Sequence, residues 1–146
     1  MDATPATAVA DALGTVLQRG FRNKLYAELT RALDESLDVS TYPVISAVAR
    51  YGPSSAGALA SEVGVDRSVV SRRAGRLVQA GYLRTVTDGS DARFVLLELT
   101  PKGREAVTIM RERLSEAIAR RLGDWPEASQ EAFAQLLTCF VQDGPL

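Results

Sequence analysis

The strongest constraint on the fold lies in residues 66–104, whose sequence is DRSVVSRRAGRLVQAGYLRTVTDGSDARFVLLELTPKGR. Asp66, a helix-capping residue type, precedes a helical pattern that Gly81 ends. Two short runs rich in β-branched residues follow, and they flank the turn signal Asp88-Gly89. This order predicts a helix, a β-hairpin and the start of another helix. The expected bounds are 67–80 for the helix, 82–87 and 94–99 for the strands, and Thr100-Pro101 for the next helix start.

Charge is distributed unevenly along the chain. Residues 66–104 carry eight Lys/Arg and four acidic residues, a local net charge of +4, although the whole chain carries −1. Residues 1–65 sum to −2 and residues 105–146 to −3. Local charge, rather than the total, decides whether a surface attracts nucleic acid. A basic middle between acidic flanks therefore favours a nucleic-acid contact in residues 66–104.

Composition argues against several classes of protein. At 146 residues and 46% hydrophobic content, the chain fits one compact domain with a substantial core. It has no histidine and one cysteine, Cys139, which excludes His-based zinc sites, catalytic triads and an internal disulfide. It also lacks a Gly-rich phosphate loop. We therefore expect no enzyme, no metal and no cofactor, since catalysis would have to rest on carboxylates, lysine, tyrosine or serine alone.

The sequence gives no sign of a membrane protein. No uninterrupted apolar run approaches the roughly 18 residues that a membrane span needs. The N-terminal residues lack the basic and apolar blocks of a targeting signal. The expected location is the cytoplasm.

An apolar ladder runs through the first third of the chain. It predicts one long helix from Thr4-Pro5 to about Glu35, and its four-residue spacing drifts by roughly 40° per step on a 3.6-residue helix. A stripe that winds in this way does not face one flat partner. We expect one end to pack on the chain's own domain and the other on a second subunit; the alternative is a core helix of a monomer. The ladder residues are Leu13, Leu17, Phe21, Leu25, Leu29 and Leu33.

Four further helices are expected outside residues 66–100. Pro43 places the start of the second helix near Ser40, because proline is tolerated in the first turn. Ser55 is a typical cap for the third helix, and Gly64 provides the turn after it. The expected bounds are Ser40–Tyr51, a short helix after Ser55, a helix from Pro101 to about Leu122, and a last helix that begins near 124–126.

The helix expected over residues 67–80 has two distinct faces. Val70, Ala74 and Leu77 share one side and predict the buried face. Ser68 and Arg72 point away from it, flanked by Val69, Ser71 and Arg76. Arginine can bond guanine O6 and N7 together, and serine can reach a base or a phosphate, so Arg72 is the first candidate for a base contact. The alternative is that these charges are ordinary solvated surface.

These residues carry a resemblance to a known family. The sequence resembles transcriptional regulators of the MarR (multiple antibiotic resistance regulator) family over nearly its whole length. The resemblance implies a mainly α fold with a small β wing: a winged helix-turn-helix core at about 40–99, between dimerisation helices at about 5–35 and 101–146, all in one domain. It also implies a homodimer that reads an inverted repeat in double-stranded DNA, and a ligand cleft between the two parts. The motifs that carry it are Val65–Arg72, Gly81–Leu83, Asp88–Arg93 and Leu99–Gly103.

The resemblance assigns roles to individual positions and shows departures. Ser55 lies at the position of a helix cap that can contact a DNA phosphate in the family. Arg93 lies at the position of the family's wing-tip arginine, which would reach the minor groove or a phosphate. Ala92 stands where the family often has a second arginine, and Pro43 lies inside a helix that the family usually starts earlier. The expected DNA-contacting residues are Ser55, Arg67, Ser68, Val69, Ser71, Arg72, Arg73, Arg76 and Arg93.

Two functional hypotheses remain open from the sequence. One is a dimeric repressor that leaves its operator when a small aromatic or phenolic effector binds. The other is a winged-helix module that binds an acidic protein partner without reading bases. Aromatic residues near the first two helices could line an effector cleft or belong to the core. Cys139 is expected to be a buried structural thiol rather than a redox sensor. The aromatic residues, with one arginine, are Phe21, Arg22, Tyr26, Tyr42 and Tyr51.

Overall fold

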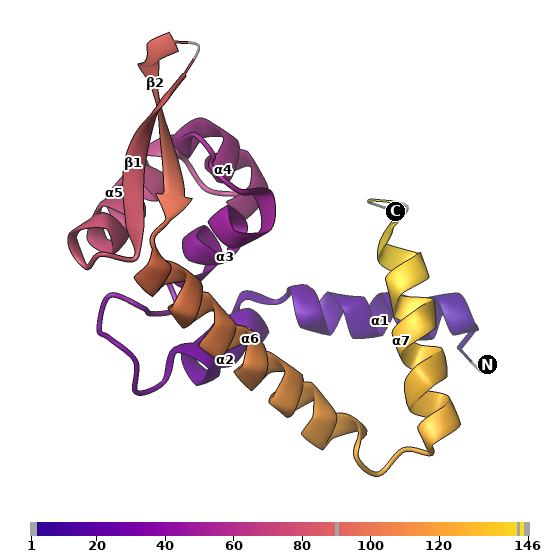
Figure 1. Cartoon of the computed structure of the whole chain (residues 1–146). Helices are drawn as coiled ribbons and strands as arrows, with labels where there is room; N and C mark the ends of the chain where they lie inside the picture. Colours follow the sequence, from indigo (N-terminus) through magenta and orange to yellow (C-terminus); the bar gives the residue numbers. More distant parts are fainter. Residues whose placement is uncertain (1–2, 90, 143, 145–146) are drawn as a thin grey trace. The chain divides into compact units, whose positions relative to one another are not determined.

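The computed structural model describes residues 3–89, 91–142 and 144, and within them it contains seven helices and one two-stranded sheet (Figure 1). The chain divides into two compact units, Met1–Arg111 and Glu112–Leu146. The predicted class, mainly helical with a small β wing, is confirmed. The elements are α1 (Pro5–Leu17), α2 (Arg19–Thr30), α3 (Tyr42–Tyr51), α4 (Ala56–Val63), α5 (Arg67–Gln79), β1 (Leu83–Asp88), β2 (Asp91–Leu99), α6 (Pro101–Leu122) and α7 (Glu127–Gln142).

The first helix of the chain begins where predicted but is not continuous. The Thr4 side chain caps α1 by accepting a hydrogen bond from the Thr7 backbone N–H at 3.2 Å. Gln18, with ψ 136°, then separates α1 from α2, and α2 ends at Thr30. The prediction of one helix to Glu35 was therefore wrong. Glycines at positions 14 and 20 lower helix propensity on both sides of the break. The spacing of apolar side chains continues across the break, so it does not reveal that the backbone of a single residue is non-helical.

The core of the first unit lies among α3, α4 and α5, which gather beside the hairpin (Figure 1). The predicted inward face of α5 is confirmed, because Val70, Ala74 and Leu77 are at most 2% exposed. Four large apolar residues of α3 and α4 are buried as well. Apolar faces spaced at 3.6 residues thus pack together and exclude water. The buried residues of α3 and α4 in question are Val44, Ile45, Val48 and Leu59.

The end of α5 is fixed by a left-handed cap. Gly81 has φ +85°, a conformation that glycine adopts without a Cβ penalty. Its N–H donates to the Val78 carbonyl at 3.0 Å, and the Tyr82 N–H donates to the Leu77 carbonyl at 2.9 Å. This pair of bonds is the Schellman motif. The helix end predicted at Gly81 is confirmed, and the cap sets the direction in which the chain enters the hairpin.

The hairpin is slightly longer than predicted. β1 and β2 pair antiparallel with Leu83 opposite Leu99, and the register shifts between Thr87 and Asp88. The segment before α4 also joins this sheet. Ser54 and Leu97 exchange two backbone hydrogen bonds, at 3.0 and 2.8 Å. The hairpin is therefore attached directly to the helix-turn-helix.

The start of α6 approaches the cap of α5 closely. The Thr100 hydroxyl donates to the Gly81 carbonyl and accepts from the Gly103 N–H, so it caps α6 and joins it to the turn. Gly103 is buried against the backbone of Tyr82, and a Cβ at this position would overlap the Tyr82 carbonyl. Met110, 2% exposed, continues the contact with the core. The end of α5, the base of the hairpin and the first turns of α6 therefore form one tightly packed junction.

The helices nearest the two ends of the chain leave apolar side chains exposed. α1 buries no residue, and Leu17 is 67% exposed; α2 buries only Leu29 and Thr30. In the second unit, Trp125 meets Phe133 edge to face at 5.4 Å. α7 buries none of its described residues. Its large exposed apolar residues are Phe133, Leu136, Leu137, Phe140 and Val141.

Cys139 also lies on α7 and is exposed as a free thiol. The prediction of a buried thiol was wrong for the single chain, because α7 packs too few side chains to cover its surface. Among the residues that the structure describes, no helix combines the length and the apolar character needed to cross a membrane.

Candidate nucleic-acid interface

The helix-turn-helix is formed by α4, a turn and α5. Ser55 begins α4 by accepting a hydrogen bond from the Ala58 N–H at 3.1 Å, as predicted for a cap. Gly64, with φ +78°, ends α4 in a left-handed conformation. Asp66 is the N-cap residue of α5, but its side chain makes no capping hydrogen bond. Its carboxylate still suits the positive end of the α5 dipole. The turn thus presents the first residues of α5 to solvent.

The outward face of α5 has the residue types expected for base and phosphate contacts. Ser68, Ser71 and Arg72 are exposed, together with Arg67. Within residues 3–89, 91–142 and 144, no hydrogen bond or ion pair occupies the side chains of Ser68, Ser71 or Arg72. They are therefore accessible to another molecule. Val69 and Arg73 are half-buried, so less of each is available for an external contact.

The wing tip is described only in part. Arg93, the predicted wing contact, lies in β2 by its backbone. Its side chain is outside the described part of the chain, as is that of Ala92. The DNA contact of Arg93 therefore stays a prediction from the sequence.

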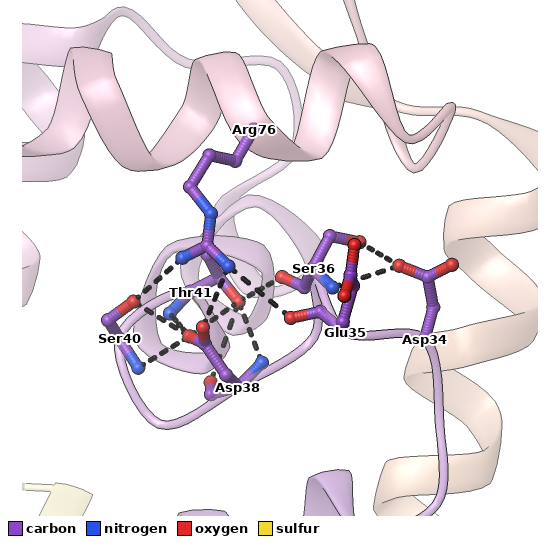
Figure 2. A network of polar contacts seen from close by, with 7 residues as sticks. All are labelled: Asp34, Glu35, Ser36, Asp38, Ser40, Thr41 and Arg76. Carbon is purple, nitrogen blue, oxygen red and sulfur yellow. Dashed lines mark hydrogen bonds and ion pairs between the residues drawn. The ribbon is translucent and has the colours of Figure 1, made fainter.

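Arg76 has partners inside the chain that sequence reasoning missed. Its guanidinium reaches from α5 to the segment that joins α2 and α3 (Figure 2). Nη2 forms an ion pair with Asp38 Oδ2 at 2.8 Å and donates to the Glu35 carbonyl at 3.3 Å. Nη1 donates to Ser40 Oγ at 3.2 Å. In this structure the Arg76 guanidinium, which was expected to contact DNA, instead binds residues 35–40.

Asp38 is the centre of this polar network. Its Oδ1 accepts hydrogen bonds from the Ser40 N–H and hydroxyl, at 2.9 and 2.7 Å, and from the Thr41 N–H at 3.0 Å. Partial burial opposes ionisation, but the bonds from Arg76, Ser40 and Thr41 outweigh it and hold the pKa of Asp38 well below its ordinary value. The carboxylate is thus ionised and fixed in position.

A repeated sequence pattern could have indicated these turns. Asp34-Glu35-Ser36 and Asp38-Val39-Ser40 both have the Asp-x-Ser spacing of an Asx turn. Asp34 Oδ1 accepts from the Ser36 hydroxyl at 2.6 Å and from its N–H at 2.9 Å, and these bonds lower the pKa of Asp34. The pattern predicts the local turns. It does not predict that an arginine 38 positions further along the chain meets the second one.

We expect Asp38→Asn to lower the free energy of unfolding at pH 7 by up to about 1 kcal/mol, because the ion pair is exposed and screened. Since the folded pKa is depressed, the stabilisation is present above the unfolded value of about 3.9 and is lost as the pH falls through the folded value. Urea unfolding at about pH 7, 4 and 2.5 should therefore show a difference that shrinks with acid. Asp11→Asn on α1 is the matched control. A pH-independent difference would assign the effect to packing.

A pocket of about 270 Å³ lies among α2, α3 and α4. The rings of Tyr26 and Tyr42 are 4.6 Å apart at its wall. Burial raises the pKa of Tyr42, and a hydrogen bond to Glu62 raises the pKa of Tyr51. Four of the five residues predicted for an effector cleft line this pocket, and Phe21 does not. The lining is Arg22, Tyr26, Tyr42, Pro43, Ser46, Ala47, Arg50, Tyr51, Glu62 and Val63.

Comparison with known proteins identifies the helix-turn-helix and wing. The family model described as the MarR family matches residues 36–93, which include α3, α4, α5 and β1. Residues 36–93 are thus similar to the winged helix of the MarR family. The MarR-family resemblance stated from the motifs of α5 and the hairpin is thereby confirmed.

Proteins that are similar to this chain are described as transcriptional regulators. It is 25% identical to the HTH-type transcriptional regulator YxaD of Bacillus subtilis (strain 168), described as uncharacterized, over 116 residues, which are 80% of this chain and 81% of YxaD. A MarR transcriptional regulator from Methanosarcina mazei Go1 matches 94% of this chain and 96% of its own, with TM-score 0.73 and 16% identity. The PcaV transcriptional regulator from Streptomyces coelicolor, solved with its natural ligand, matches 97% and 98%, with TM-score 0.59 and 22% identity. The chain therefore has the fold of a MarR-family transcriptional regulator.

Proposed function

We propose that this chain is a sequence-specific DNA-binding transcriptional regulator that binds an inverted repeat as a homodimer. The observation that carries the proposal is the outward face of α5, where Ser68, Ser71 and Arg72 are exposed and unoccupied within the described residues. Short hydroxyls and one long guanidinium at the start of a recognition helix suit the major groove. The net charge of +4 over residues 66–104 supports attraction to phosphates.

The exposed apolar faces of α1 and α7 support a homodimer. Monomeric proteins rarely leave contiguous apolar patches of this kind in water. The faces belong to the segments to which the MarR-family resemblance gives a role in dimerisation. Two recognition helices related by a twofold axis would meet half-sites about 34 Å apart, which is one turn of DNA.

The pocket beside Tyr26 and Tyr42 supports regulation by a small aromatic or phenolic effector. Its paired rings offer stacking, and Arg22 and Arg50 offer hydrogen bonds to a phenol or a carboxylate. PcaV, a regulator of similar fold, was solved with a natural ligand. In the proposed mechanism the effector releases the dimer from its operator, so that the chain acts as a repressor.

We expect Arg72→Ala to weaken binding to the chosen DNA by about 1 to 3 kcal/mol and to relax the sequence preference, because a base contact is lost. Arg93→Ala should instead weaken binding to all sequences and reduce the salt slope. The measurement selects DNA from a random pool with the native protein and then titrates selected and scrambled duplexes by mobility shift at several salt concentrations.

Arg120→Ala in α6 removes the same charge outside the winged helix and is the control for both variants. Unchanged binding of Arg72→Ala to the selected site would contradict the base contact. A native protein that prefers no duplex over a scrambled one would favour the second hypothesis, an interaction module that binds an acidic protein through the same basic surface.

A further inference from the structure

The segment of residues 31–41 joins α2 to α3 and holds the guanidinium of Arg76 (Figure 2). We propose that Arg76 is a positioning residue and not a DNA contact: it fixes the outward face of α5 relative to this segment, and the segment connects α5 to the pocket beside Tyr26 and Tyr42. The inference rests on the proposed DNA-binding function. It assigns to Arg76 a role opposite to the one expected from its place on the helix.

The contacts of Arg76 oppose a simultaneous contact with phosphate. Both terminal nitrogens are engaged, one with Asp38 and Glu35 and the other with Ser40. Arg72, one helical turn earlier, has no such partner among the described residues. Release of Arg76 to DNA would break a charge-assisted bond at 2.8 Å and leave the Asp38 carboxylate against an approaching phosphate. The two arginines on one face of α5 are therefore not equivalent.

The network does not serve mainly to stabilise the fold. The side chains of Arg76 and Asp38 are 43% and 40% exposed, and exposed ion pairs contribute little to stability. The buried face of α5 and the cap at Gly81 already hold the helix in the core. Asp38 also keeps its bonds to Ser40 and Thr41 when Arg76 is removed. Loss of the guanidinium thus frees α5 from the segment without unfolding either one.

A continuous chain of contacts runs from the pocket to α5. The ring of Tyr42 lies 4.6 Å from that of Tyr26 at the pocket wall. The preceding residue, Thr41, is fully buried and donates its N–H to Asp38 at 3.0 Å. Asp38 in turn binds Arg76 on α5. A displacement of Tyr42 would therefore be transmitted through two residues to the outward face of α5.

The test uses the full-length protein and a duplex that the native chain selects from a random pool. The variants are Arg76→Gln, Asp38→Asn and the two together. We expect each single variant to reduce the preference for the selected over the scrambled duplex about tenfold, and the double variant to add nothing further. The slope of log affinity against log salt should stay unchanged. Arg76→Lys, which keeps the charge facing Asp38, should restore part of the preference.

The opposite results are equally specific. If Arg76 contacted phosphate directly, Arg76→Gln would reduce the salt slope by about 0.9 for each subunit, which is about 1.8 for the dimer. Asp38→Asn, which frees the arginine, would then bind as tightly as the native chain or more tightly. Those results would overturn the positioning role while the proposed function stands. A variant that is unfolded by thermal denaturation at the assay temperature would assign the network to folding and overturn it too. If the native chain selects no duplex, the proposed function itself fails.

Discussion

Replacing Gly103 with alanine is expected to destabilise the fold by about 3 kcal/mol or more. The new Cβ would overlap the carbonyl of Tyr82 and press against Leu99. The carbonyl belongs to backbone whose neighbours form the cap of α5, so it has no rotamer through which to move away. The structure relieves the overlap only by lifting α6 from the junction. Urea denaturation of the two proteins, followed by circular dichroism, measures the loss.

Gly75→Ala is the matched control for this prediction. Gly75 lies within α5, and a Cβ there would meet nothing within 4 Å. Because glycine in a helix interior costs about 1 kcal/mol relative to alanine, this variant should be slightly more stable than the native protein. The close approach at Gly103 would be refuted by equal stability of the two alanine variants.

An aspartate in place of Phe140 is expected to convert the proposed dimer to a monomer and to reduce affinity for the selected duplex by a factor of about 100 or more. Phe140 is 40% exposed on an α7 face that also contains Leu136, which is 69% exposed. A carboxylate buried in a subunit interface without a partner is costly, and loss of the second recognition helix removes the gain from bivalent binding. Sedimentation velocity gives the oligomeric state, and titration of the selected duplex gives the affinity.

Gln135→Asp controls for charge and helix propensity, since Gln135 lies on the opposite face of α7 from Phe140. This variant should remain dimeric and bind DNA like the native protein. Two outcomes argue against the interface: a dimeric Phe140→Asp variant, or loss of the dimer in both variants.

The winged helix could be predicted from the sequence because its elements begin and end with local chemistry. Ser55 and the Thr100-Pro101 pair mark helix starts, and Gly81 marks a helix end, through contacts with residues close in sequence. The buried face of α5 follows from 3.6-residue spacing alone. Four of the five residues predicted for an effector cleft also line one pocket, because α2 and α3 bring their side chains to the same space. Effector binding in this pocket stays a prediction.

The features that were missed depend on tertiary contacts or on one residue's backbone. Arg76 looks like any outward arginine until Asp38 is placed beside it in space. The break at Gln18 leaves the apolar ladder intact, so periodicity continues across it. Phe21 fits the ladder but does not line the pocket: on α2 it points about 100° away from its neighbour Arg22, which does line the pocket.

The close junction of the α5 cap, Thr100 and Gly103 limits how this protein can be recombined with its relatives. A hybrid that imports only a foreign recognition helix, or only a foreign hairpin, would join backbones that were not selected to approach one another at Tyr82. Residues 35–110 instead form one exchangeable block, from the segment that binds Arg76 to the last buried residue of α6. An operator preference would then be transferred with its geometry intact, and crossover points placed between residues 82 and 100 would give hybrids that fold poorly.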